Sequence, residues 1–252
     1  MKKTLRASSL IAGLAAAVLP LAACSGTDSA TETSAPASAE VVVFAAASME
    51  GAFTELASKW EEDGGAPITF QFGGSNGLVD QIAEGAPADL LITADTRTMD
   101  RAVEEELVTD PEPLATNSLV LALAPGNPGE ISSLEDALAS SRLVICDAEV
   151  PCGNATATLF ELFGVTANPA SLESSVSDVR GKIESGEADA GVIYKTDALA
   201  AGLDVIELDR ADEVVTTVVS AAVTDSEAAA EFLAYLRGDD AKEVLETYGF
   251  QP

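Results

Sequence analysis

Two serines stand out because each lies between an apolar, β-branched segment and a segment with helical spacing. Ser48 follows residues 41–45, and Ser75 lies in the glycine-rich stretch 73–77 that follows residues 68–72. A hydroxyl group and the free N–H groups of a helix start donate hydrogen bonds to a negative ligand without any cationic side chain. The pair therefore predicts an anion-binding site at one edge of a sheet. The alternative is that each serine only caps its helix.

The composition limits which other chemistry is available. The 252 residues contain no histidine, which removes Ser-His-Asp and Cys-His catalysis and histidine-ligated zinc. With 42 acidic and 13 basic residues the formal net charge is −29, so nucleic acid is disfavoured as a partner. A hydrophobic content of 47% is enough to bury sizeable cores. We expect a folded protein that is not an enzyme; an exported α/β enzyme or a surface interaction protein stays open as an alternative.

The N-terminus has the organisation of an export signal. Three basic residues precede an apolar run over residues 10–23, which is short of the roughly 20 residues that span a membrane. The run ends in Leu21-Ala22-Ala23-Cys24, which resembles the lipobox of bacterial lipoproteins. We expect a signal peptide over 1–23, lipidation of Cys24, and a flexible tether over 24–39, rich in Ser, Thr, Ala and Pro. Removal of the signal peptide, with its three basic and no acidic residues, gives a net charge of −32.

Two cysteines remain if Cys24 carries lipid. Cys146 and Cys152 lie six positions apart in a chain expected to be exported, where disulfides persist. We expect a disulfide that stabilises the fold by only about 2 kcal/mol, because the loop is short, and that mainly fixes the local backbone. The alternatives are a redox pair or half of a metal site. The spacing differs from the Cys-x-x-Cys of redox pairs, and the lack of histidine argues against a metal site.

The elements that must position these residues alternate between strand and helix patterns. Apolar runs predict strands over 41–45, 68–72, 89–93, 118–124, 143–146, 190–194 and 214–223. Helical spacing follows at 49–62, after 77, and at 99–107, 134–139, 154–163, 179–185, 227–236 and 241–248. The proline-containing stretch 111–114 separates two such series. The alternation predicts an α/β fold with mostly parallel sheets flanked by helices, and ligands in such folds bind in the loops after the strands.

Several short segments, taken together, resemble a known family. They are Val43-Phe44-Ala45-Ala46-Ala47-Ser48, Phe72-Gly73-Gly74-Ser75, Gly85-Ala86-Pro87-Ala88-Asp89-Leu90-Leu91-Ile92-Thr93-Ala94-Asp95, Val150-Pro151-Cys152-Gly153, Asp178-Val179-Arg180-Gly181, Gly191-Val192-Ile193-Tyr194 and Tyr248-Gly249-Phe250. Their order and spacing are similar to those of the molybdate-binding proteins of ABC importers, across nearly the whole chain after residue 40. The segment that begins at Gly85 is the most specific of them.

The resemblance implies a type II periplasmic-binding-protein fold, with two lobes joined by a two-strand hinge. Residues 40–117 and 217–252 would form lobe I, and residues 118–216 would form lobe II. A tetrahedral oxyanion would be held between the lobes.

The resemblance also implies the ligand-binding residues. They are the hydroxyls of Ser48, Ser75 and Tyr194 and the main-chain N–H groups of Cys152 and Val179. The family often has alanine at the position of Cys152, which a backbone donor tolerates. Asn76 and Gly77 replace hydroxyl residues that are common in the family, so an auxiliary hydroxyl contact is not expected there. Asp89 and Asp95 are expected to have structural roles as caps or turn formers.

The function that the resemblance implies is that of an extracytoplasmic receptor. It would bind molybdate, and also tungstate, and deliver the anion to an ABC permease, as a monomer held at the cell membrane only by its lipid anchor. No cofactor is expected, and molybdenum would bind only as the oxyanion and not as a bare metal cation. A receptor for another tetrahedral oxyanion, such as sulfate, is the alternative within the same fold. These dianions only accept hydrogen bonds, whereas monohydrogen phosphate also needs an acceptor such as a carboxylate.

Overall fold

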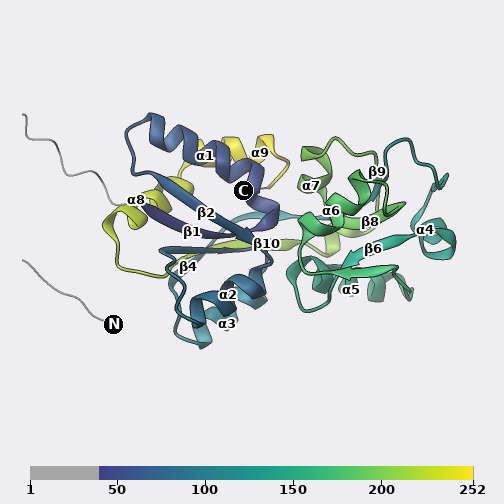
Figure 1. Ribbon diagram of the computed structural model, residues 1–252, viewed down its shortest axis with the longest axis horizontal. Helices are drawn as coiled ribbons and strands as arrows, with labels where there is room; N and C mark the ends of the chain where they lie inside the picture. Colours follow the sequence, from purple (N-terminus) through teal and green to yellow (C-terminus); the bar gives the residue numbers. More distant parts are fainter. Residues whose placement is uncertain (1–39, 252) are drawn as a thin grey trace, which may run out of the picture. The chain divides into compact units, whose positions relative to one another are not determined.

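The computed structural model describes residues 40–251, and two five-stranded sheets organise this part of the chain (Figure 1). The strand orders are β2-β1-β3-β10-β4 and β7-β6-β8-β5-β9. In each sheet the fourth strand of this order runs antiparallel to its neighbours, and the other four strands run in one direction. The predicted α/β fold with two mostly parallel sheets is therefore confirmed.

The first sheet and its helices form lobe I. Its strands are β1 (Val41–Ala46), β2 (Ile68–Gly73), β3 (Leu90–Thr93), β4 (Thr109–Asn117) and β10 (Thr216–Ala222). Its helices are the 3₁₀ turn η1 (Ala47–Met49), α1 (Glu50–Glu62), α2 (Ser75–Ala83), α3 (Thr96–Glu104), α8 (Glu227–Leu236) and α9 (Asp239–Thr247). Figure 1 shows α1 and α9 on one face of this sheet and α2 and α3 on the other.

The alternation of side chains along β1 explains this two-sided covering. Val43 and Ala45 belong to the larger hydrophobic core, together with residues of α1, whereas Phe44 packs in a smaller core with Leu78 of α2 and Met99 of α3. Because successive residues of a strand point to opposite faces, a strand with continuous apolar residues must be covered by helices on both sides.

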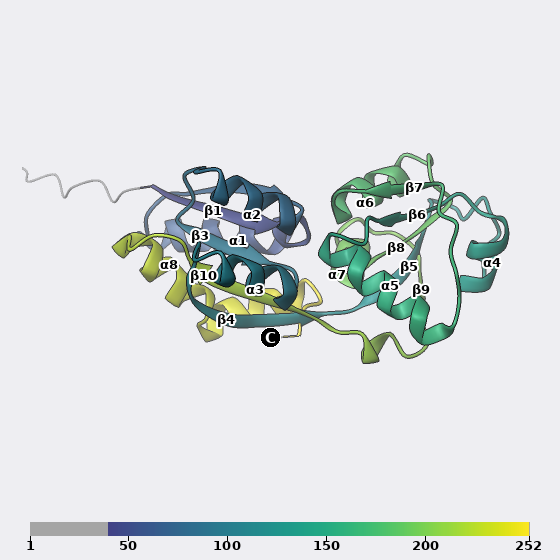
Figure 2. The ribbon, with the colours of Figure 1, turned by 90° about the horizontal axis from the view of Figure 1, so that it is seen from below.

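The second sheet and its helices form lobe II (Figure 2). Its strands are β5 (Leu119–Leu123), β6 (Leu143–Cys146), β7 (Ser171–Glu173), β8 (Ala190–Tyr194) and β9 (Val205–Glu207). Its helices are α4 (Leu134–Ser140), α5 (Pro151–Phe163), α6 (Val176–Glu184), α7 (Lys195–Ala200) and the 3₁₀ turn η2 (Ala211–Glu213).

The chain passes between the two sheets twice. The first passage is Ser118, between β4 and β5, and the second joins β9 to β10 through η2. Asn117 contacts both passages. Its side chain accepts the Ser118 N–H and donates to Thr196 Oγ1 at 2.8 Å. Its carbonyl oxygen accepts from Thr216 Oγ1 at 3.4 Å. The lobe boundaries at residues 117 and 216 stay a prediction.

One predicted interruption is in fact a strand. The stretch 111–114 was expected to break the pattern, but it lies inside β4 and pairs with β10. Two prolines are tolerated there because β4 is at the edge of its sheet and has only one neighbouring strand, and the pairing contains register shifts. The three-residue strands β7 and β9 and the short helix α7 were also not predicted.

The expected signal peptide 1–23, the lipidation site Cys24 and the tether 24–39 lie outside the described residues. Between residues 40 and 251 no helix is both long enough and apolar enough to cross a membrane.

Candidate functional site

A small cavity lies between loops that follow the carboxyl ends of strands in both sheets. We call it the interlobe cavity. Its volume is about 20 Å³. Since a single water molecule needs about 10–15 Å³, the cavity admits only a very small ligand. It is lined by Ala46, Ala47, Ser48, Gly73, Gly74, Ser75 and Ala94 from lobe I and by Val150, Pro151, Cys152, Ser175, Val176 and Tyr194 from lobe II.

The lobes approach each other closely at this cavity. A Cβ atom placed on Gly74 would lie 2.4 Å from the carbonyl oxygen of Ser174 in the other lobe. Such a distance is too short for any side chain, so the absence of a side chain on Gly74 permits the approach observed.

Neither predicted serine caps a helix through its side chain. Ser48 lies within η1, and Ser75 is the first residue of α2, whose N-cap is Gly74. The Ser75 hydroxyl oxygen accepts a hydrogen bond from the Ala94 N–H at 3.2 Å. The Ser48 hydroxyl is buried and has no hydrogen-bond partner among the described residues. The capping alternative for these two serines is therefore wrong, and at least one hydroxyl is available to a ligand.

Tyr194 ends β8 and brings a third hydroxyl to the cavity from lobe II. Its side chain is 1% exposed, and its hydroxyl also lacks a hydrogen-bond partner among residues 40–251. Burial raises the pKa of Tyr194 strongly, and the negative charge of Asp95 raises it further, while the Thr216 side chain acts in the opposite direction. The phenol therefore stays protonated near neutral pH and is available as a donor.

Cys152 contributes a backbone donor from the start of α5. Its side chain forms the expected disulfide with Cys146, with the two Cα atoms 5.7 Å apart. Cys152 is the second residue of α5, after Pro151, so its N–H group has no acceptor within the helix. A Cβ atom on Gly153 would lie 1.9 Å from the carbonyl oxygen of Asp147, which shows how tightly the disulfide loop folds back on the helix start.

Val179 does not line the cavity. It is the fourth residue of α6, and its N–H group donates to the Ser175 carbonyl oxygen at 3.4 Å. The residues of this helix start that do line the cavity are Ser175 and Val176, which sequence reasoning missed. The Ser175-x-x-Asp178 spacing could have located them, because a serine three residues before an acidic residue marks a helix start. Ser175 indeed accepts the Asp178 N–H with its side chain.

The interlobe cavity contains hydrogen-bond donors but no charged side chain. The first turns of α2, α5 and α6 contribute to its walls, and no Asp, Glu, Lys or Arg is among the residues that line it. Unpaired N–H groups and the positive ends of three helix dipoles attract negative charge. The cavity therefore suits a small anion that carries no proton to donate.

The two aspartates that flank β3, and Arg180 of α6, have contacts outside the cavity lining. Asp95 caps α3 by accepting the Thr98 N–H at 2.9 Å, and Asp89 accepts the Val42 N–H, so both have the structural roles expected for them. Arg180 does not line the cavity. Its guanidinium lies 3.8 Å from Asp197, whose pKa is raised by burial to about 7 although Arg180 opposes the shift.

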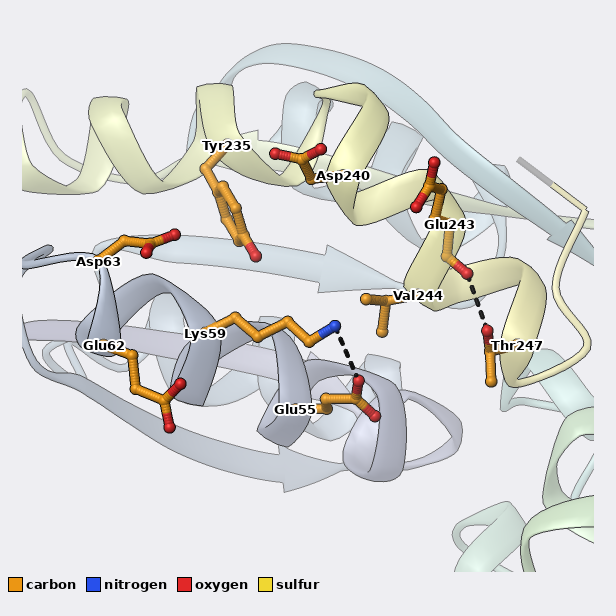
Figure 3. Close-up of a pocket in the computed structure, with 9 residues that line it drawn as sticks. All are labelled: Glu55, Lys59, Glu62, Asp63, Tyr235, Asp240, Glu243, Val244 and Thr247. Atoms are coloured by element: carbon orange, nitrogen blue, oxygen red, sulfur yellow. Dashed lines mark hydrogen bonds and ion pairs between the residues drawn. The ribbon is translucent and has the colours of Figure 1, made fainter.

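A second, larger hollow lies within lobe I between α1 and the two C-terminal helices (Figure 3). Its volume is about 360 Å³, and we call it the acidic pocket. Its lining residues are Glu55, Lys59, Glu62, Asp63, Tyr235, Asp240, Glu243, Val244 and Thr247. The single lysine is already paired with Glu55 at 3.1 Å. An anion would be repelled here, so the larger hollow is not the candidate site.

Within the described part of the chain, no group of three or more Cys, Asp or Glu side chains is arranged to hold a metal ion.

Comparison with known proteins identifies the family of this chain. Residues 41–251 match the profile of a family described as bacterial extracellular solute-binding protein. The chain belongs to this family.

Individual members of this solute-binding family are similar over nearly their whole length. The molybdate-binding protein ModA of Mycobacterium tuberculosis H37Rv is 34% identical over 253 residues, which cover 96% of this chain and 97% of the relative. The putative ABC transporter substrate-binding lipoprotein YvgL of Bacillus subtilis is 30% identical over 256 residues, with 96% and 97% covered. The solved periplasmic molybdate-binding protein of Azotobacter vinelandii has the same fold, with a TM-score of 0.72, 18% identity, and 84% and 99% of the two chains covered.

Proposed function

We propose that this solute-binding protein is a receptor for molybdate, and also for tungstate, that delivers the anion to an ABC permease. The observation that carries the proposal is a pair of buried hydroxyls without partners, on Ser48 of lobe I and Tyr194 of lobe II, which line the same 20 Å³ cavity. A buried polar group without a hydrogen bond costs about 1–3 kcal/mol. Two of them across one cavity indicate that a ligand supplies the missing acceptor.

The donors proposed for the anion are all uncharged. They are the hydroxyls of Ser48, Ser75 and Tyr194 and the N–H group of Cys152. Val179 is the fifth donor implied by the family resemblance, and its N–H would have to exchange its long bond to Ser175 for the ligand. Hydrogen bonds to a charged group contribute about 1.5–3 kcal/mol each, so five give roughly 8–15 kcal/mol before the cost of bringing the lobes together. That range is enough for micromolar or tighter binding.

The chemistry of the lining favours a fully deprotonated tetrahedral anion over phosphate. Monohydrogen phosphate carries a proton that needs an acceptor, and no carboxylate lines the cavity. Molybdate, tungstate and sulfate only accept hydrogen bonds. The choice of molybdate among them is supported by the name of the Mycobacterium tuberculosis relative, which is 34% identical to this chain.

The proposed location is the outer side of the cell membrane. The family is one of extracellular proteins, and the Bacillus subtilis relative is named a lipoprotein. We propose that Cys24 carries the lipid, that the protein acts as a monomer without a cofactor, and that lipid is its only membrane attachment. Binding of the anion would favour the arrangement in which both lobes contact it, and the permease would recognise that arrangement.

A panel of anions tests this function. Thermal unfolding of the full chain would be followed in molybdate, tungstate, sulfate and phosphate, with isothermal calorimetry for each anion that stabilises it. We expect molybdate and tungstate to raise the melting temperature in proportion to the logarithm of their concentration, and phosphate to have no effect. Stabilisation by sulfate alone would reassign the ligand. No stabilisation by any of the four anions would favour a protein of a different class.

A further inference from the structure

The loop closed by the disulfide contacts lobe I at a place outside the interlobe cavity. Arg97, in the first turn of α3, donates from Nη2 to the carbonyl oxygen of Glu149 at 2.8 Å and to that of Ala148 at 3.5 Å. Asn76 of α2 donates from Nδ2 to the same Glu149 oxygen. Two side chains of lobe I therefore converge on one backbone carbonyl of lobe II.

Both donors are held in place by other residues of lobe I. Thr98 Oγ1 donates to Asn76 Oδ1 at 3.0 Å, which orients the amide so that its nitrogen points away toward Glu149. Arg101 donates to the Asn76 carbonyl oxygen at 2.9 Å. The guanidinium of Arg97 lies 3.9 Å from the buried carboxylate of Asp95. These contacts do not involve lobe II, so the donors are oriented before the lobes meet.

The acceptor, the carbonyl oxygen of Glu149, is fixed in position by other residues of lobe II. The Asp147 N–H donates to the Glu173 carbonyl oxygen at 2.8 Å, and the Asp147 side chain accepts the Glu149 N–H at 2.9 Å. The disulfide then closes the loop between Cys146 and Cys152. The carbonyl of Glu149 is thereby fixed relative to the N–H of Cys152, which lies three residues further along at the cavity.

We propose that Arg97 and Asn76 form a clasp on the disulfide loop. They are positioning residues: they do not touch the ligand, but they favour the closed arrangement of the lobes and hold the Cys152 N–H over the cavity. The proposal rests on the proposed function, because it concerns how the same cavity retains its anion. Hydrogen bonds present only when the lobes are together raise the population of the closed form and slow the release of the ligand.

The expected size of the effect follows from the exposure of the clasp. The Arg97 side chain is 48% exposed, so its bonds to the loop compete with water. We expect the loss of Arg97 to weaken binding about threefold to tenfold, the range of one net hydrogen bond. The change should fall on the dissociation rate, because the donors take part only after the lobes close.

The first experiment measures molybdate binding to the full chain carrying Arg97→Gln. Calorimetry gives the affinity, and stopped-flow displacement by excess tungstate gives the dissociation rate. The matched control is Arg210→Gln, which removes another exposed arginine; among residues 40–251 it pairs with Glu213 and donates to the Leu162 carbonyl, both in its own lobe. We expect faster dissociation in Arg97→Gln alone, with the melting temperature of the ligand-free protein unchanged.

A double-mutant cycle tests whether Arg97 acts through the disulfide loop. Arg97→Gln is combined with Cys146→Ser and Cys152→Ser, which leave the backbone donor at residue 152 in place. We expect Arg97→Gln to change the dissociation rate by less than about twofold once the loop is no longer closed, because coupled residues are not additive. Should the disulfide-free protein fail to fold, the cycle between Arg97→Gln and Asn76→Ala replaces it, since both donors share one acceptor.

The outcomes separate this proposal from the proposed function. A wild-type protein that does not bind molybdate contradicts the proposed function. A wild-type protein that binds molybdate while Arg97→Gln dissociates at the wild-type rate overturns the clasp and leaves the function standing. Full additivity in the double-mutant cycle also overturns it.

Discussion

The interlobe cavity and the acidic pocket show that a strongly acidic chain can contain a cavity with no charged side chain in its walls. The cavity is small and has no charged side chain in its walls, whereas the pocket is many times larger and contains five carboxylates and one lysine (Figure 3). A chain with a net charge of −29 can therefore offer an anion a neutral, donor-rich site. Surface charges act weakly beyond about 8 Å at physiological salt, while helix starts and hydroxyls act at contact distance.

The difference also teaches why size alone is a poor guide to the site. The acidic pocket opens between helices, and its one lysine is already paired: the carboxylate of Glu55 raises the pKa of Lys59 by accepting its hydrogen bond. The interlobe cavity instead leaves two buried hydroxyls unsatisfied. Two uncharged buried donors that face the same cavity are a more specific observation than empty volume.

The strongest way to break this contrast is to place a carboxylate in the cavity. We expect Ser48→Asp to weaken molybdate binding by about a thousandfold or more, because two like charges about 4 Å apart repel by about 4 kcal/mol at an effective dielectric of 20. Calorimetry measures the loss. Ser58→Asp, the same substitution on the exposed face of α1, is the control and should bind as the wild type does. Binding by Ser48→Asp within tenfold of the wild type would place the ligand elsewhere.

Removal of the lobe II hydroxyl should have the next largest effect. We expect Tyr194→Phe to weaken molybdate binding about tenfold to a hundredfold, the value of one hydrogen bond to a charged group. The melting temperature of the ligand-free variant should be unchanged or higher, because the hydroxyl has no hydrogen-bond partner among residues 40–251. Calorimetry and thermal unfolding together check this prediction.

Tyr248→Phe is the matched control for this variant. The Tyr248 hydroxyl donates to Glu55 at 3.1 Å within lobe I, and Tyr248 is not among the residues that line the cavity. It should bind molybdate normally. Equal effects of the two substitutions would contradict a role for Tyr194 in the site.

The carboxyl of Asp197, three residues after Tyr194, differs from the more exposed carboxylates of the acidic pocket. It is buried, and burial keeps it partly protonated near neutral pH. Its pKa rises from the ordinary 3.8 to about 7 in the folded protein. The unfolded chain then holds fewer protons than the folded one between these values, so this group's contribution to stability is full below about pH 4 and is lost as the pH rises through 7. We expect Asp197→Asn to remove this pH-dependent contribution to stability.

Urea unfolding at pH 5 and pH 8 measures the effect. Between pH 5 and pH 8 the wild type should lose on the order of 2 kcal/mol of unfolding free energy that Asp197→Asn does not lose. Each pH unit between the two pKa values contributes about 1.4 kcal/mol. Parallel pH dependence in the two proteins would mean that Asp197 is ionised throughout this interval.

The smallest effect is expected from neutralising the acidic pocket. Glu55→Gln combined with Glu243→Gln removes two charges from its lining. We expect molybdate affinity at physiological salt to change by less than about twofold, because those charges are screened from the cavity. Repetition of the titration at low salt is the control for long-range effects. A tenfold gain in affinity at physiological salt would show that the overall charge does oppose binding.

The fold could be predicted largely from local patterns, and the failures have local causes. The strand β4 was missed because its prolines signal an interruption, and only its place at the edge of the sheet makes them harmless. The start of α6 was placed three residues late, at Val179, because apolar spacing was followed and the Ser175-x-x-Asp178 cap was not. Val179, the donor that the family resemblance implies, lies three residues beyond Val176, which lines the cavity.

Sequence alone determined the donor types, the two α/β halves and the pair Cys146 and Cys152, because each depends on residue identity and short-range spacing. Tertiary structure decided which groups meet. The matching strand orders of the two sheets, which no sequence repeat reveals, bring the loop after β1 to Tyr194 at the end of β8. Local patterns do not show whether Ser48 caps a helix or faces a cavity. Nor do they show that Arg97 reaches the carbonyl of Glu149 in the other lobe, because these residues lie more than 50 positions apart in the chain.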